Sequence, residues 1–114
     1  MNSKLWMWTA CDIVDALETG EIHQLDVLES LESRYLSVNP IINALPTICF
    51  EKARISLNTA DQNQKLKKRP LFGLPVPIKD SYAVSGVRTT FGSKAFTDFV
   101  PKYSDMVVKT IVNS

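Results

Sequence analysis

The chain has 114 residues, 45% of them hydrophobic, and a formal net charge of +1. This length predicts one domain at most, with an ordinary globular composition. A charge so close to zero gives no reason to expect nucleic acid or an anionic membrane as a direct partner.

The cysteines, the histidine and the N-terminal residues exclude further classes of protein. Cys11 and Cys49 lack metal-ligand spacing and the sequence has one histidine, so we expect no zinc site and no cofactor. The start, MNSKLWMWTA, lacks the continuous apolar region of a secretion signal, and no run approaches the roughly 20 apolar residues that cross a bilayer. We therefore expect a soluble, cytoplasmic protein with reduced cysteines in its core.

Two helices are expected between residues 9 and 37. Thr9 and Asp12 have the spacing of a capping box, and the apolar residues that follow recur at helical intervals. Gly20 is a typical end for this first helix.

The second helix is predicted from about Gln24 to Leu36, because its apolar residues form one stripe and its acidic residues face water. Asn39-Pro40 is expected to end it. His23 stands at its start. An imperfect cap explains this histidine better than a general base does, since nothing around it orients it for proton transfer.

A strand is expected at 44–50, with Pro46 at a sheet edge, followed by a surface helix at 51–68. The end of that helix carries a basic cluster. The cluster consists of Lys65, Lys67, Lys68 and Arg69. It is either a phosphate or nucleic-acid patch or a favourable placement of cations at a helix C-terminus, and the lack of interleaved aromatic residues favours the second interpretation.

The most informative segment is PLFGLPVPIKDSYAVSGVRTTFGS, residues 70–93. Leu74–Ile78 is predicted to be an edge strand, because it is short, apolar and contains two prolines. Lys79 then ends the strand in water or is held in an apolar site. Burial disfavours the charged form of an amine, so only a lysine in an apolar site is suited to act as a base.

Residues 81–99 are expected to form a loop with short extended pieces, because glycines and small polar residues recur there. A last helix is predicted from Asp105 to Val112, with Ser104 as its cap. It stops after about two turns without a C-terminal cap signal.

Two motifs in this region resemble the amidase signature family. Gly73 to Asp80, GLPVPIKD, resembles the family's G-[IL]-P-x-x-x-K-D, and Gly86 to Ser93, GVRTTFGS, resembles its G-x-x-T-T-x-G-S. The likeness extends more loosely over most of the chain. It implies an α/β fold class, as the N-terminal portion of the amidase-signature fold, with helices packed on a mixed β-sheet, truncated at Ser114.

On this interpretation residues 1–114 are a partial amidase domain. Its parts are helices at 9–37, a strand at 44–50, a helix at 51–68, the lysine-bearing strand and loop at 70–99 and the start of a helix at 105–114. Strand edges and an apolar face would lack their cover, so we expect the chain alone to fold poorly and to be inactive.

The resemblance implies hydrolysis of amide carbon–nitrogen bonds by a Ser–cis-Ser–Lys triad, with Lys79 as its base. The two serines belong to a Gly/Ser-rich stretch, and Ser81, Ser85, Ser93 and Ser104 do not match it. No nucleophile and no substrate-binding residue is assigned. The implied partner is a small-molecule amide substrate, and no metal is implied.

Two alternatives stay open. The chain is the amidase subunit of a tRNA-dependent transamidation complex, which shares the lysine segment, or it is a non-catalytic remnant or interaction protein, because both serines are absent from the sequence. A homodimer or amidotransferase partner subunits are the protein partners that these alternatives suggest.

Overall fold

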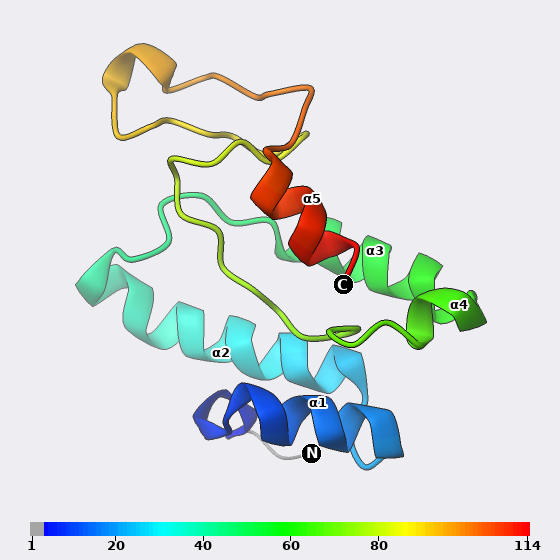
Figure 1. The fold of residues 1–114 in the computed structure, drawn as a ribbon. Helices are drawn as coiled ribbons and strands as arrows, with labels where there is room; N and C mark the ends of the chain where they lie inside the picture. Colours follow the sequence, from blue (N-terminus) through cyan, green and yellow to red (C-terminus); the bar gives the residue numbers. More distant parts are fainter. Residues whose placement is uncertain (1–3) are drawn as a thin grey trace. The chain divides into compact units, whose positions relative to one another are not determined.

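The computed structural model describes residues 4–114 (Figure 1). Its helices, in chain order, are η1 (Leu5–Met7), α1 (Ala10–Thr19), α2 (Gln24–Ile42), α3 (Phe50–Asp61), α4 (Gln64–Lys67), η2 (Lys94–Phe96) and α5 (Met106–Val112). The chain divides into two compact units. The first has the described residues up to Pro46 together with Phe50–Pro75, and the second has Thr47–Cys49 together with Val76–Ser114.

The predicted mixed α/β sheet is wrong, because residues 4–114 contain no β-strand. Figure 1 draws no arrow in this part of the chain. The described β-type pairing is one isolated antiparallel bridge between Val84 and Val87. The chain is therefore a set of helices joined by irregular segments.

The strand expected at 44–50 is a loop followed by the first residue of α3. The Asn39 side chain bonds the backbone groups of Leu45 that a neighbouring strand would otherwise bond. Its Oδ1 accepts the Leu45 N–H at 2.9 Å, and its Nδ2 donates to the Leu45 carbonyl at 3.3 Å. Pro46 then has no N–H to give to a ladder. With these groups satisfied locally, the segment needs no partner strand.

The strand expected at Leu74–Ile78 is also irregular coil. Pro75 and Pro77 remove two N–H donors from this short stretch. Alternating apolar side chains indicate an extended backbone, but a strand also needs a second segment to pair with. No such ladder forms within residues 4–114.

The first helix begins and ends where the sequence predicts. Thr9 Oγ1 accepts the Asp12 N–H at 3.1 Å and donates to the Asp12 carboxylate at 2.7 Å. Gly20 is the C-cap of α1. The N-cap prediction is therefore confirmed.

The second helix is capped better and runs longer than predicted. His23 Nδ1 accepts the Leu25 N–H at 3.3 Å, and the Asp26 carboxylate accepts the His23 N–H at 3.3 Å, which completes a capping box. Pro40 lies inside the helix instead of ending it, and Asn43 closes the last turn in a left-handed conformation. Pro40 costs this turn one hydrogen bond but leaves the earlier turns intact.

The helix predicted over 51–68 is split in two. Asn63 adopts an extended backbone, and its side chain accepts the Lys65 N–H at 3.0 Å to cap α4. Asp61, the last residue of α3, bonds the Lys67 ammonium, with 2.7 Å between Oδ1 and Nζ. One charge of the basic cluster is therefore paired with an acid of the preceding helix.

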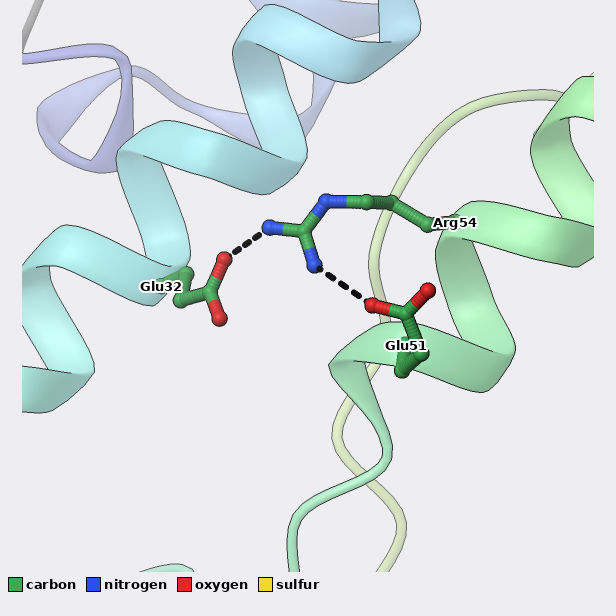
Figure 2. A network of polar contacts seen from close by, with 3 residues as sticks. All are labelled: Glu32, Glu51 and Arg54. Carbon is green, nitrogen blue, oxygen red and sulfur yellow. Dashed lines mark hydrogen bonds and ion pairs between the residues drawn. The ribbon is translucent and has the colours of Figure 1, made fainter.

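A polar network joins α2 to α3 (Figure 2). Arg54 on α3 bonds Glu32 on α2, and its other terminal nitrogen lies 3.5 Å from Glu51, on α3. The hydrogen bond with Glu32 raises the pKa of Arg54 above its ordinary value. The rings of Tyr35 and Phe50 add an apolar contact between the same helices, with 5.4 Å between their centroids.

The core of the first unit is small and joins its N-terminal elements. Leu5 of η1, Ile13 of α1 and Val27 of α2 form a buried cluster. The partly buried residues that pack against it are Trp8, Leu17, Ile22 and Leu74. None of the described helices combines the length and hydropathy that crossing a membrane requires.

Gly73 brings the start of the lysine motif close to this core. Its φ is +81°, and a Cβ atom there would lie 2.8 Å from Gln24 Cβ and 3.2 Å from Leu17 Cδ1. Gln24 is buried, and its Nε2 donates to Asp61 Oδ1 at 3.0 Å, so it has little freedom to move aside. Both the backbone conformation and the space require glycine here.

The second unit is largely irregular chain tied to α5. The prediction that Ser104 caps α5 is wrong, because the N-cap is Asp105. The Asp105 carboxylate accepts the Ala83 N–H at 2.6 Å, and the Asp105 N–H donates to the Ala83 carbonyl at 3.0 Å. Ser104 Oγ instead accepts the Ser85 N–H at 2.8 Å. Two side chains at the start of α5 thus hold the turn at 83–85.

We predict that Gly73→Ala destabilises the first unit more than Gly20→Ala. Both glycines have positive φ, so alanine costs about 1–2 kcal/mol of backbone strain at either position. A methyl group at Gly20 meets no atom within 4 Å, whereas at Gly73 it collides with Gln24. Denaturant unfolding followed by circular dichroism compares the two variants. Equal losses of unfolding free energy would contradict a close approach at Gly73.

We also predict that the contact between α3 and α4 weakens in acid. The hydrogen bond from Lys67, and then that from Gln24, lowers the pKa of Asp61 below its ordinary value of 3.8. The contact is therefore stabilising above about pH 4 and is lost as the pH falls through the folded-state pKa. An NMR titration of the Asp61 carboxyl carbon should give a higher midpoint in Lys67→Met than in the parent chain. An unchanged midpoint would show that Lys67 does not stabilise the carboxylate.

Candidate active site

Lys79, the predicted base, lies in the second unit, in the coil that follows Ile78. Its side chain is exposed. Its backbone is held, because the Lys79 carbonyl accepts the Tyr82 N–H at 3.0 Å. Within residues 4–114 the main chain of Lys79 is therefore held by a hydrogen bond, and its side chain is exposed to solvent.

Asp80 follows the lysine and accepts three hydrogen bonds from the second motif. Its Oδ1 accepts the Thr90 N–H at 2.8 Å, and its Oδ2 accepts the Thr90 hydroxyl. Its main-chain carbonyl accepts the Phe91 N–H at 2.9 Å. The two sequence motifs are therefore joined directly, from the last residue of the first to the middle of the second.

The two threonines of the second motif have different roles. Thr89 is buried, its N–H donates to the Phe99 carbonyl at 3.0 Å, and its hydroxyl donates to the Val87 carbonyl at 3.1 Å. The Thr90 hydroxyl instead donates to the Asp80 carboxylate. The second sequence motif includes both threonines but does not predict this partnership, because no spacing rule relates residues ten apart in irregular chain.

The loop that carries the second motif closes on itself. The Gly86 N–H donates to the Pro101 carbonyl at 2.9 Å, which joins its two ends. Three phenylalanine rings pack together along it, with centroids 5.3 to 6.1 Å apart. They belong to Phe91, Phe96 and Phe99. The loop is therefore held by contacts of its own as well as by those with Asp80.

Two serines of this region, Ser93 and Ser104, support local structure. Ser93 Oγ accepts the Ala95 N–H at 3.2 Å and caps η2. Ser104 Oγ binds the backbone of Ser85. These contacts explain the hydroxyls without catalysis, and no nucleophile is assigned to this chain.

The remaining candidates of the sequence do not form a second site. Cys11 and Cys49 are free thiols, but both are exposed, so the expected core placement is wrong. His23 caps α2. In the part of the chain that the structure describes, no group of three His, Cys, Asp or Glu side chains is placed to hold a metal ion.

Comparisons with known proteins agree with the two motifs. A family model described as Amidase matches residues 26–114. A glutamyl-tRNA(Gln) amidotransferase subunit from Roseiflexus sp. is 37% identical over 101 residues, which is 88% of this chain and 21% of the relative. Proteins of the same name from Lawsonia intracellularis and Caldanaerobacter subterraneus are 29% and 33% identical, over 86% and 96% of this chain and 22% and 23% of their own lengths.

The chain thus spans about a fifth of the length of these curated relatives. No solved structure matches it. The family match covers both motifs and the Asp80–Thr90 contact that joins them. This chain belongs to the amidase family.

Proposed function

We propose that this sequence supplies the lysine-bearing part of an enzyme that cleaves amide carbon–nitrogen bonds, with Lys79 as the base. The observation that supports this most strongly is the Amidase family match over residues 26–114, which includes GLPVPIKD and GVRTTFGS. The amidase resemblance assigns the base to the lysine of the first motif. The structure supports the proposal by showing that both motifs are held together at Asp80.

In this proposal the neutral amine of Lys79 accepts a proton from one serine, which in turn accepts the proton of the nucleophilic serine. The nucleophile attacks the amide carbonyl, the amine leaves, and water hydrolyses the acyl-enzyme. Since Lys79 is exposed among residues 4–114, further polypeptide must cover it to favour the neutral amine. The serine-bearing stretch has no counterpart in this sequence, so the chain by itself is proposed to be inactive.

The names of the relatives favour one form of this function. Each of the three relatives above is a glutamyl-tRNA(Gln) amidotransferase subunit. We therefore propose that the amide chemistry serves a transamidation complex, with other amidotransferase subunits as partners in the cytoplasm. Co-purification with such subunits and tRNA would support this form, whereas hydrolysis of simple amides by an isolated homodimer would support a free-standing amidase.

The base is tested in a chimera in which residues 26–114 replace the matching segment of the Roseiflexus relative. We predict that Lys79→Ala lowers kcat for ammonia release from primary amides by about 10²–10⁴-fold, the usual contribution of a general base. Circular dichroism should show an unchanged fold, because the bond that holds Lys79 to Tyr82 involves its main-chain carbonyl and not its side chain.

Lys94→Ala is the matched control, since it removes another exposed cation of the same unit. It should leave kcat near the parent value. Full activity in Lys79→Ala would overturn the assignment of the base. A folded but inactive parent chimera would favour the alternative of a non-catalytic interaction protein.

A further inference from the structure

We infer that Asp80 is a positioning residue that, through Thr90, holds the backbone of Lys79 in a fixed relation to the loop of the second motif. This inference rests on the proposed role of Lys79 as a base. In this inference Asp80 and Thr90 determine the position from which the Lys79 side chain extends. Neither residue takes part in proton transfer.

The contacts that carry the inference form a two-sided clasp between Asp80 and residues 90–91. On one side the carboxylate accepts both the N–H and the hydroxyl of Thr90. On the other side the Asp80 carbonyl accepts the Phe91 N–H at 2.9 Å. A residue bonded through its side chain and its main chain to two consecutive residues has little freedom to rotate. Lys79, its direct neighbour, is further restrained by the bond from Tyr82.

The chemistry of the clasp requires an aspartate and a hydroxyl. An ionised carboxylate has only acceptor sites, so it satisfies two donors at once and forms charge-assisted bonds. Asparagine would lose one of these acceptors to an NH₂ group. The Thr90 hydroxyl also accepts the Gly92 N–H at 3.3 Å, so a chain of donors runs from Gly92 through Thr90 to Asp80.

The backbone at Phe91 indicates that the loop is held in place. Phe91 has φ +54°, a left-handed conformation that a bulky residue adopts only where its surroundings enforce it. Two sets of contacts enforce it here. The first is the hydrogen bond to Asp80, and the second is the packing of the ring against Phe96 and Phe99, with centroids at 5.3 and 6.1 Å.

A positioned base explains why such a clasp lies next to Lys79. A lysine side chain is long and flexible, so a fixed main chain reduces the search for the reacting geometry. Misplacement of a catalytic group by about 1 Å can lower a rate by about 10²-fold. The clasp holds the main chain directly after Lys79, and the bond from Tyr82 holds the Lys79 carbonyl itself.

The clasp is tested first without any activity, in the chimera with the Roseiflexus relative, by hydrogen exchange of the Thr90 and Phe91 amides followed by mass spectrometry. Asp80→Ala should speed exchange at both amides by at least about tenfold, because their acceptor is lost or released. Thr89→Val is the control, since the Thr89 hydroxyl binds only within its own loop at Val87. Amides that exchange freely in the parent chimera, or that stay protected in its Asp80→Ala variant, would overturn the inference.

The positioning role is tested second, in the chimera with the Roseiflexus relative. Thr90→Val keeps the shape of the side chain and removes its hydroxyl, whereas Thr90→Ser keeps the hydroxyl. We expect Thr90→Val to lower kcat by about 10–100-fold with KM changed less than about twofold, and Thr90→Ser to restore most of kcat. Thr89→Val should stay near the parent value.

The outcomes separate this inference from the proposed function. Normal kcat in Thr90→Val, together with loss of activity in Lys79→Ala, would overturn the positioning role and leave the base in place. Full activity in Lys79→Ala would overturn the proposed function itself. Equal losses of kcat in Thr90→Ser and Thr90→Val would also count against the clasp. They would mean that the loss comes from altered packing and not from the hydroxyl, which Thr90→Ser retains.

Discussion

The second unit depends on the requirement that polar backbone groups find partners where no sheet supplies them. Two aspartates meet it. Asp80 uses its carboxylate for Thr90 and its carbonyl for Phe91, whereas Asp105 uses its carboxylate and its own N–H for Ala83. Each attachment has two points, as neighbouring strands have, and each joins segments at least ten residues apart. Carboxylates therefore do in this unit what a hydrogen-bond ladder does in a sheet.

The first unit meets the same requirement through helices and their caps. Thr9 and His23 satisfy the free N–H groups at the starts of α1 and α2. Polar helix residues usually lie at the surface, but Gln24, the residue after His23, is buried against Gly73. The first residue of the first motif, Gly73, is therefore needed for packing against α1 and α2, whereas Lys79 of the same motif is the proposed base.

Local features of this protein could be predicted from its sequence, and pairings between distant segments could not. The cap at Thr9 depends on a residue three positions away, so the local sequence pattern was sufficient to predict it. Alternation at Leu74–Ile78 indicates an extended chain but not whether a partner strand exists. Serine is a favoured residue at a helix N-cap, yet the N-cap of α5 is Asp105, whose carboxylate bonds Ala83, 22 residues earlier. The family resemblance placed both motifs correctly without indicating their direct contact.

The position of Gln24 has a consequence for chain length. Its amide bonds Asp61 at the end of α3, and its Cβ faces Gly73, so both ends of the segment 61–73 meet one side chain. Insertions or deletions between these ends would leave the anchor in place, and the entropy of closing a loop changes only slowly with its length. The α4 region is therefore open to variation in length, provided that Lys67 keeps its bond to Asp61.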